Sequence, residues 1–280
     1  MAEAQAPATA GTFERATAVS LERAEEVQRH FSASVEEGWR AGRGPHGGYL
    51  SAIILRALIE SVEDSARSPR SLTIHFMRAP EPGGVGLTTR LERAGRNMSF
   101  LSARMDQGGR VWGLALGAFS PAWPGPEISE AQMPAAAPPH AGREPGTVIP
   151  IESGGPEFAR HITLQPRFGG MPFGERSQAM ESGGWLGLAE PRELDALALA
   201  FFCDALIPAP FMRVQAPAPA PTIDITIHFR SAQIARPPEE LVLARSRARL
   251  VHEGFFEEDA EIWAADGTLL AQSRQLALLG

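Results

Sequence analysis

Pro191-Arg192-Glu193-Leu194-Asp195-Ala196-Leu197-Ala198-Leu199-Ala200-Phe201-Phe202-Cys203-Asp204-Ala205-Leu206-Ile207-Pro208 is the stretch that decides the fold. Pro191 suits the first turn of a helix, the acids at 193 and 195 favour a helix N-terminus, and Pro208 is a stop signal. Every residue from Ala196 to Ile207 except Asp204 is apolar. The stretch therefore predicts a helix that is buried on all sides and too short to cross a membrane. Burying the Asp204 carboxylate is costly, so it is either well hydrogen-bonded or used in chemistry.

Composition and charge narrow the class of protein. The chain has 280 residues, 44% of them hydrophobic, and a formal charge of −7, which argues against a nucleic-acid-binding surface. Cys203 is the only cysteine, so no intramolecular disulfide or thiolate metal cluster is expected, and it is interpreted as a small packed hydrophobe. No spacing of ligand residues suggests a metal site, and no cofactor is expected. The first twelve residues lack a basic start and an apolar run, which favours a cytoplasmic protein.

An internal repeat organises the rest of the chain. A Gly-rich loop, Gly42 to Gly48, precedes a predicted helix from Tyr49 to Val62, and four strand-like runs follow it. The same order returns around the apolar stretch and four further strand-like runs, which start at about residues 222, 241, 254 and 268. The offset between equivalent positions grows slowly, from 148 residues at Arg56/Asp204 to 153 at His75/His228, as expected for a duplication with short loop insertions.

The repeat predicts an α+β fold in which each half wraps a curved antiparallel sheet around one central helix. We expect an N-terminal repeat over 13–120, a Pro/Ala/Gly-rich linker over 121–156 and a C-terminal repeat over 157–280. Because the helix of the second half is apolar all round, it needs a partner besides its own sheet. The equivalent helix of the first half, packed across a pseudo-two-fold axis, is the natural candidate.

Five sequence runs, in order along the chain, resemble a known family. They are Pro45-His46-Gly47-Gly48-Tyr49-Leu50, Ser71-Leu72-Thr73-Ile74-His75-Phe76-Met77-Arg78, Gly95-Arg96-Asn97-Met98-Ser99-Phe100, Ala220-Pro221-Thr222-Ile223-Asp224-Ile225-Thr226-Ile227-His228-Phe229 and Asp266-Gly267-Thr268-Leu269-Leu270-Ala271-Gln272-Ser273-Arg274-Gln275. They are similar to the acyl-CoA thioesterase II (TesB-like) family, over roughly residues 13 to 279. The resemblance implies a double-hotdog fold and hydrolysis of an acyl-CoA substrate to free CoA and a carboxylic acid.

The resemblance also implies a site of Asp204, Thr222 and Gln275 that holds the attacking water. A thioester can be hydrolysed by water directly if a general base deprotonates and orients that water, and Asp204 would be that base. The Thr222 hydroxyl and the Gln275 amide would fix the water and keep the carboxylate hydrogen-bonded. A backbone N–H at a helix N-terminus could stabilise the oxyanion, and Gly48 is the candidate.

Other interpretations stay open. Asp204 could be a structural carboxylate that caps a neighbouring backbone. Strand alternation places Thr222 with Asp224, Thr226 and His228 on the polar face, so alternation alone does not bring it to Asp204. Gln275 fits better, because it shares a face with the small residues Ala271, Ser273 and Ala277. In the first half Arg56, Pro69 and Gly117 stand where Asp204, Thr222 and Gln275 do, which predicts one working site per chain.

Two further functions compete with hydrolysis. One is a non-catalytic acyl-CoA or acyl-chain binding protein that keeps the groove without the chemistry. The other, weaker one is a hotdog hydratase or dehydratase that uses His46 with an acid, although the sequence shows no partner carboxylate near His46. His75 and His228 occupy equivalent strand positions, which favours a structural role. An exposed edge strand could pair with another chain, so a homodimer or higher homo-oligomer is plausible.

Overall fold

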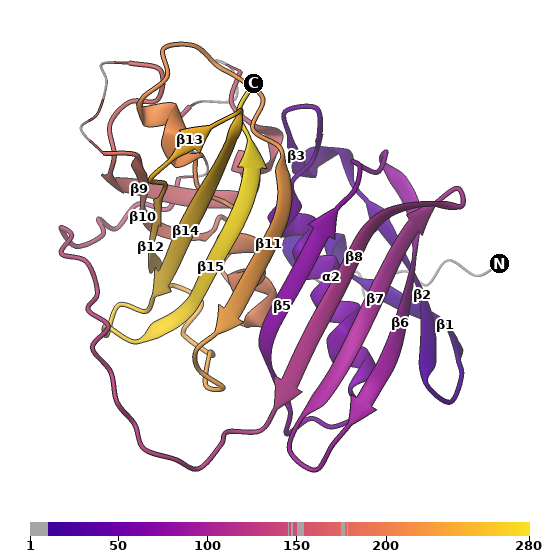
Figure 1. The fold of residues 1–280 in the computed structure, drawn as a ribbon. Coiled ribbons are helices and arrows are strands. Elements are labelled where there is room, and N and C mark those ends of the chain that lie inside the picture. The colour runs from indigo at the N-terminus through magenta and orange to yellow at the C-terminus, as the bar shows by residue number, and fades with distance from the viewer. Residues whose placement is uncertain (1–10, 145, 147, 150–153, 175–176, 178) are drawn as a thin grey trace.

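A computed structural model describes residues 11–144, 146, 148–149, 154–174, 177 and 179–280 (Figure 1). The first half contains α1 (Thr12–Ala16), β1 (Val19–Ala24), β2 (Gln28–Val35), η1 (Glu37–Trp39), β3 (Arg40–Ala41), β4 (Gly44–Pro45), α2 (Gly47–Ser61), β5 (Ser68–Phe76), β6 (Gly83–Ala94), β7 (Ser99–Gln107) and β8 (Arg110–Ser120). The second contains η3 (Glu157–His161), β9 (Ile162–Phe168), β10 (Glu181–Leu188), α3 (Ala196–Phe202), η4 (Ala209–Met212), β11 (Thr222–Phe229), β12 (Val242–Arg247), β13 (Val251–His252), β14 (Phe255–Trp263) and β15 (Leu269–Leu278).

The two halves share one antiparallel sheet of thirteen strands. Its order is β1-β2-β6-β7-β8-β5-β11-β15-β14-β12-β10-β9, with β13 paired to β14, so the halves meet where β5 lies beside β11 (Figure 1). At that joint Thr73 pairs with Thr226, and their hydroxyl oxygens lie 3.0 Å apart. Equivalent residues of the two repeats thus face each other across a pseudo-two-fold axis. The predicted double-hotdog, α+β fold is confirmed.

Both repeats carry the same irregularity at the start of the joint strands. The register of β5 against β8 shifts between Pro69 and Ser71, and the register of β11 against β15 shifts between Thr222 and Asp224. Such a bulge places two residues opposite one and turns the chain locally. Because Pro69 was matched with Thr222 from the sequence, the shared bulge supports the correspondence between the repeats.

The helix of the second half is shorter than the sequence predicted. Helix α3 begins at Ala196, where the side chain of Asp195 accepts the N–H of Ala198 at 2.8 Å as an N-cap, and it ends at Phe202. The helix expected from Pro191 to Ile207 is therefore wrong at both ends. Asp195 competes for the helix N–H groups and fixes the start. After Phe202 the backbone tightens, because the N–H of Asp204 bonds to the carbonyl of Phe201 at 3.2 Å.

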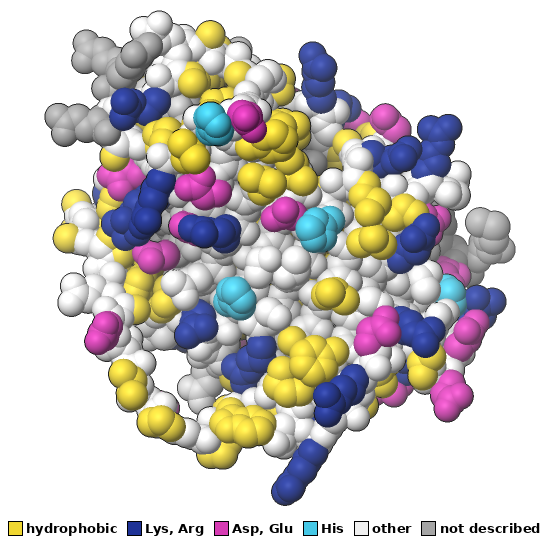
Figure 2. All heavy atoms as spheres, viewed as in Figure 1, with side chains coloured by type: hydrophobic (Ala, Val, Ile, Leu, Met, Phe, Trp, Pro, Cys, Tyr) yellow, Lys and Arg dark blue, Asp and Glu magenta, His cyan; other side chains and the backbone are white. Residues whose placement is uncertain are grey.

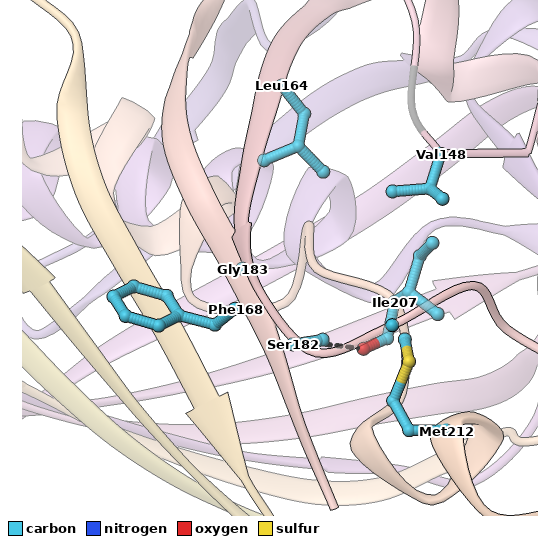
Figure 3. Close-up of a pocket in the computed structure, with 8 residues that line it drawn as sticks. Val148, Leu164, Phe168, Ser182, Gly183, Ile207 and Met212 are labelled. Carbon is cyan, nitrogen blue, oxygen red and sulfur yellow. Dashed lines mark hydrogen bonds between the residues drawn. The ribbon is translucent and has the colours of Figure 1, made fainter. Parts of the chain in front are cut away.

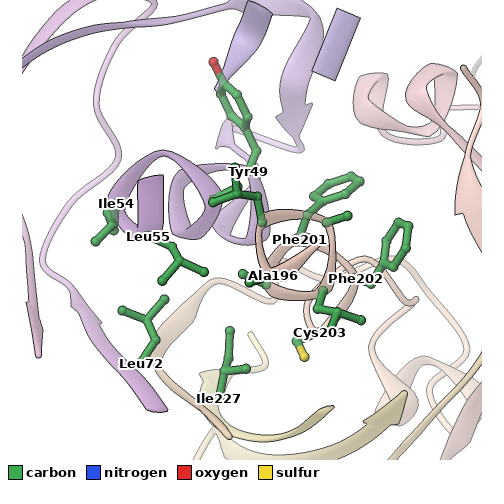
Figure 4. Packing of buried hydrophobic residues seen from close by; sticks show 14 of the residues in the cluster. Tyr49, Ile54, Leu55, Leu72, Ala196, Phe201, Phe202, Cys203 and Ile227 are labelled. Carbon is green, nitrogen blue, oxygen red and sulfur yellow. The ribbon is translucent and has the colours of Figure 1, made fainter. Parts of the chain in front are cut away.

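The burial predicted for this helix is confirmed. All seven residues of α3 are buried, as is most of α2. Figure 4 shows the two helices side by side, with Leu72 of β5 and Ile227 of β11 beneath them. The core therefore consists of two apolar helices against the inner face of the shared sheet. None of the helices in the described part of the chain combines the length and apolar character needed to cross a membrane.

The outer face of the sheet is mixed in character, with separate groups of apolar side chains among charged ones (Figure 2). His75 and His228 lie on exposed positions of β5 and β11, and His75 Nδ1 is 4.0 Å from a carboxylate oxygen of Asp224. These histidines therefore lie on the outer face of the sheet, and the structural role that their equivalent positions favoured stays a prediction.

The segment predicted as a linker packs against the second half. Within 121–156, residues 145, 147 and 150–153 lie outside the described residues, and the described ones form no helix or strand apart from an isolated bridge between Gly146 and Thr163. The indole N–H of Trp185 donates to the carbonyl of Ala137 at 2.8 Å, and Gln165 exchanges hydrogen bonds with the backbone of His140. The segment is thus irregular but attached. The boundaries of the two repeats stay a prediction.

Candidate active site

Asp204 lies in the turn that follows α3, not inside the helix as expected. Its side chain is 11% exposed and reaches the N-terminus of α2, where the N–H of Gly48 donates to Oδ2 at 2.8 Å. A helix N-terminus carries unpaired N–H groups and a partial positive charge, so it stabilises a carboxylate. A buried acid of the second repeat is therefore held by the helix of the first.

The two glycines of α2 allow this close approach. A Cβ atom on Gly48 would lie 2.4 Å from the carbonyl oxygen of Phe201, and one on Gly47 would lie 2.8 Å from Oδ2 of Asp204. Any larger residue would force α2 and the end of α3 apart. The Gly48 N–H, the predicted oxyanion donor, is directed at the Asp204 carboxylate in this arrangement, so its oxyanion role stays a prediction.

His46 fixes the backbone on both sides of this contact. Its Nδ1 accepts the N–H of Tyr49 at 3.2 Å and caps α2, while Nε2 lies 2.9 Å from the carbonyl oxygen of Asp204. Because a carbonyl can only accept, Nε2 carries the proton and Nδ1 does not. The ring is 3% exposed, and its centroid lies 4.0 Å from that of Phe158. Burial lowers the pKa of His46, which keeps the imidazole neutral, although the Asp204 charge acts in the opposite direction.

The sequence showed no carboxylate partner for His46, and that expectation is wrong. Its Nε2 is 3.6 Å from Oδ2 of Asp204. The sequence could not show this contact, because the two residues lie 158 positions apart and meet only when the two repeats pack.

Thr222 reaches the same carboxylate. Its Oγ1 is 3.4 Å from Oδ1 of Asp204 and 3.4 Å from Oε1 of Gln275. Strand alternation had placed Thr222 on the polar face, and the bulge corrects this. Thr222 pairs with Ala277, which is buried on the inner face, whereas Asp224 pairs with Leu276. Since directly paired residues of an antiparallel sheet point to the same face, the bulge turns Thr222 inward.

Gln275 lies where alternation predicted. It is 7% exposed and pairs with Ile225 of β11, so it points to the inner face. Its neighbours on that face, Ala271, Ser273 and Ala277, are small and buried. Asp204, Thr222 and Gln275 thus come from three separate segments, and the structure brings their side chains together.

One buried acid of this cluster was missed. Glu258 of β14 is 4% exposed and pairs with Gln275 across β14 and β15. Alternation could have found it, because Phe256, Ala260 and Ile262 at even positions of the same strand are buried. Burial, together with the negative charge of Asp204, raises the pKa of Glu258 to about 7, against the hydrogen bond that the N–H of Ala209 donates to its carboxylate.

Burial dominates the electrostatics of the cluster. It raises the pKa of Asp204, while His46, the Gly48 N–H and the Thr222 hydroxyl lower it. Burial also raises the pKa of Cys203 to about 12, so this thiol is inert, as its interpretation as a packed hydrophobe requires. Asp204 is therefore a carboxyl whose basicity is increased by its surroundings.

The first repeat has no equivalent cluster. Arg56, at the position that matches Asp204, forms an ion pair with Glu14 at 2.7 Å and donates to the Thr17 hydroxyl at 2.9 Å. A cation stands where a base would be needed. Among the described residues, no group of three or more His, Cys, Asp or Glu side chains is arranged to hold a metal ion.

A small pocket adjoins Ile207, three residues after Asp204 (Figure 3). Its lining comes from β9, β10, η4 and the loops before and after these elements, namely Val148, Leu164, Phe168, Gly170, Ser182, Gly183, Ile207 and Met212. The Ser182 hydroxyl donates to the carbonyl of Ile207, which ties β10 to the segment that carries Asp204. The lining is mostly apolar.

Comparisons with known proteins agree with this arrangement. The sequence profile of the acyl-CoA thioesterase C-terminal domain matches residues 131–279, and that of the acyl-CoA thioesterase N-terminal domain matches residues 35–120. An uncharacterized protein of Mycobacterium tuberculosis is 30% identical over 87 residues, and this match spans 30% of the length of each chain.

Two solved structures resemble the whole chain. A protein of unknown function with a hot dog fold from Alicyclobacillus acidocaldarius is 25% identical with a TM-score of 0.84, covering 97% of this chain and 98% of that one. A protein from Thermobifida fusca YX, provisionally assigned as a thioesterase II, is 27% identical with a TM-score of 0.78, covering 96% and 97%.

Proposed function

This chain belongs to the acyl-CoA thioesterase family, and from that premise we propose that it hydrolyses an acyl-CoA to free CoA and a carboxylic acid at Asp204, Thr222 and Gln275. One observation carries the proposal. The Thr222 hydroxyl lies 3.4 Å from both the Asp204 carboxylate and the Gln275 amide oxygen, although the three residues come from separate segments. Polar groups that converge from separate segments at a buried site favour a catalytic centre.

Asp204 acts as the general base. Its Oδ1 takes a proton from water while the water oxygen attacks the thioester carbonyl carbon. The tetrahedral intermediate collapses, the carbon–sulfur bond breaks, and the CoA thiolate leaves with the proton returned from Asp204. Burial raises the pKa of Asp204 toward the working pH, which makes the carboxylate a stronger base than an exposed aspartate.

Thr222 and Gln275 orient the water, and α2 supports the base. The Gly48 N–H and the positive end of the helix hold one oxygen of Asp204, which leaves the other oxygen on the side of Thr222. Gly48 would serve as an oxyanion donor only if its N–H were shared with the substrate. The apolar pocket beside Ile207 is the candidate for part of the acyl group, because it adjoins the segment that carries the base.

The test is steady-state hydrolysis of a panel of acyl-CoAs by the wild type, Asp204→Asn and Asp224→Asn. Loss of a general base should lower kcat by about 10²-fold to 10⁴-fold in Asp204→Asn. Asp224→Asn is the matched control, since Asp224 lies on β11 with a partly exposed side chain near His75 on the outer face. Turnover retained in Asp204→Asn contradicts the assignment of the base. Binding without turnover by the wild type favours the non-catalytic acyl-CoA binding protein.

A hydratase or dehydratase is the second candidate, and the approach of His46 to the Asp204 carboxylate favours it. Against it, both ring nitrogens are engaged, one by the Tyr49 N–H and the other by the Asp204 carbonyl. An assay of water addition to a 2-enoyl-CoA, monitored as the loss of absorbance of the conjugated thioester, distinguishes a hydratase from a thioesterase. A homo-oligomeric state and a cytoplasmic location stay predictions from the sequence.

A further inference from the structure

Glu258 is a buried acid that the proposed reaction does not use. The other acids of β14 are at least partly exposed, and two of them form ion pairs, Asp259 with Arg274 and Glu261 with Arg245. Glu258 has no cationic partner among the described residues; its Oε2 instead accepts the N–H of Ala209 at 2.7 Å. Burying a carboxyl without a counter-charge is costly, so its contacts must compensate or it must have a role.

The contact that connects Glu258 to the site is Gln275. The two residues are directly paired across β14 and β15 and point to the same inner face. Gln275 presents Oε1 to Thr222 at 3.4 Å, which leaves its amide nitrogen, a group that can only donate, for the carboxylate of the paired Glu258. A chain of polar contacts therefore runs from Glu258 through Gln275 and Thr222 to Asp204.

We propose that Glu258 is a positioning residue, whose carboxylate holds the Gln275 amide nitrogen and thereby keeps Oε1 toward Thr222. This inference rests on the proposed hydrolysis. Thr222 has one hydroxyl proton and two acceptors, Asp204 Oδ1 and Gln275 Oε1. With Oε1 fixed, Gln275 shares that proton with Asp204, which weakens the bond from Thr222 to Asp204 Oδ1 and leaves this oxygen freer to accept the proton of the attacking water.

The protonated form of Glu258 has the opposite effect. A neutral carboxyl donates an O–H, which attracts Oε1 of Gln275 and turns its nitrogen toward Thr222. Thr222 then accepts from Gln275 and donates to Asp204, which occupies Oδ1 and makes it a weaker base. Burial raises the pKa of Glu258 to about 7, so both forms are populated near neutral pH. Asp204 is the charged group that acts on Glu258 among the described residues; the Ala209 N–H is hydrogen-bonded to it, and Gln275 is paired with it across the strands.

The test compares the wild type with Glu258→Gln and Glu257→Gln. The latter removes an acid from the same strand at a neighbouring, partly exposed position. Because a glutamine at 258 can present either its oxygen or its nitrogen to Gln275, we expect kcat to fall by about 10-fold to 100-fold, with KM little changed, since only the base is affected. Besides the titration of the base Asp204, the wild-type kcat should rise with pH through a further inflection near 7, which should be absent in Glu258→Gln and present in Glu257→Gln.

The outcomes separate this inference from the proposed function. If the wild type hydrolyses acyl-CoAs through Asp204 but Glu258→Gln keeps both the wild-type kcat and the inflection, the positioning role is overturned and the hydrolysis stands. If Asp204→Asn retains turnover, the proposed function fails first. Should Glu258→Gln not fold, Glu258→Asp decides. Its shorter carboxyl cannot hold Gln275, so a similar fall in kcat together with loss of the inflection near 7 supports the inference, and a wild-type kcat with the inflection retained overturns it.

Discussion

Replacing Gly48 by alanine tests the contact on which the candidate site depends. Considered as an isolated helix position, the change should stabilise the protein, because alanine favours a helix by up to about 1 kcal/mol over glycine. The structure predicts the opposite sign. The added Cβ would lie 2.4 Å from the Phe201 carbonyl oxygen and 3.1 Å from Cβ of Asp204, where ordinary contacts begin at 3.4 Å.

The size of the effect follows from that difference of about 1 Å, by which α2 and the end of α3 must separate. Overpacking of this kind costs roughly 1–3 kcal/mol, and subtracting a gain in helix propensity of up to about 1 kcal/mol leaves a net loss of about 0–2 kcal/mol. Since the Gly48 N–H holds the Asp204 carboxylate at 2.8 Å, the same movement displaces the proposed base. A displacement of about 1 Å near reacting groups can lower turnover by about 10²-fold.

Urea unfolding and acyl-CoA hydrolysis, measured on the same preparations, give the two readouts. Gly84→Ala is the matched control, since a Cβ at Gly84 on β6 meets nothing within 4 Å, and it should leave both quantities near the wild-type values. If Gly48→Ala is more stable than the wild type and turns over at the wild-type rate, the two helices do not meet as closely as described, and the support of Asp204 by α2 is refuted.

Three further predictions follow from the same residues. His46→Asn keeps a side chain that can cap α2 at the Tyr49 N–H but loses the bond to the Asp204 carbonyl. His46→Ala leaves both of these buried groups unpaired, at about 1–3 kcal/mol each, so it should unfold at lower urea than His46→Asn. Both variants should lose turnover. The pKa of Glu258 is about 7 in the folded protein and 4.5 as its ordinary value, so the folded state binds more protons than the unfolded state between these pH values. The free energy of unfolding should therefore fall by roughly 3 kcal/mol as pH rises across that range. Urea unfolding of Glu258→Gln should show no such fall. Met212→Trp should fill the pocket beside Ile207 and lower kcat/KM for long acyl-CoAs more than for short ones, and an equal effect on both would remove this pocket from acyl binding.

The sequence by itself determined the features that depend on local patterns. Strand periodicity and the matching of His75 with His228 revealed the repeat, and an unbroken apolar run identified the buried helix of the second half. Alternation placed Gln275 on the inner face, and the same rule applied to β14 would have placed Glu258 there. These features need only the period of a helix or a strand, which each segment carries in its own residues.

Tertiary structure alone decided the details that assemble the site. The N-terminus of α2 in the other repeat binds the Asp204 carboxylate beyond the end of α3, although the apolar run continues past this residue. The bulge after Thr222 reverses the face that alternation assigns to it. The contact of His46 with Asp204 joins positions 158 residues apart. Helix ends, register shifts and contacts between repeats depend on which partner each backbone group finds in the folded chain, and a local pattern carries no record of that partner.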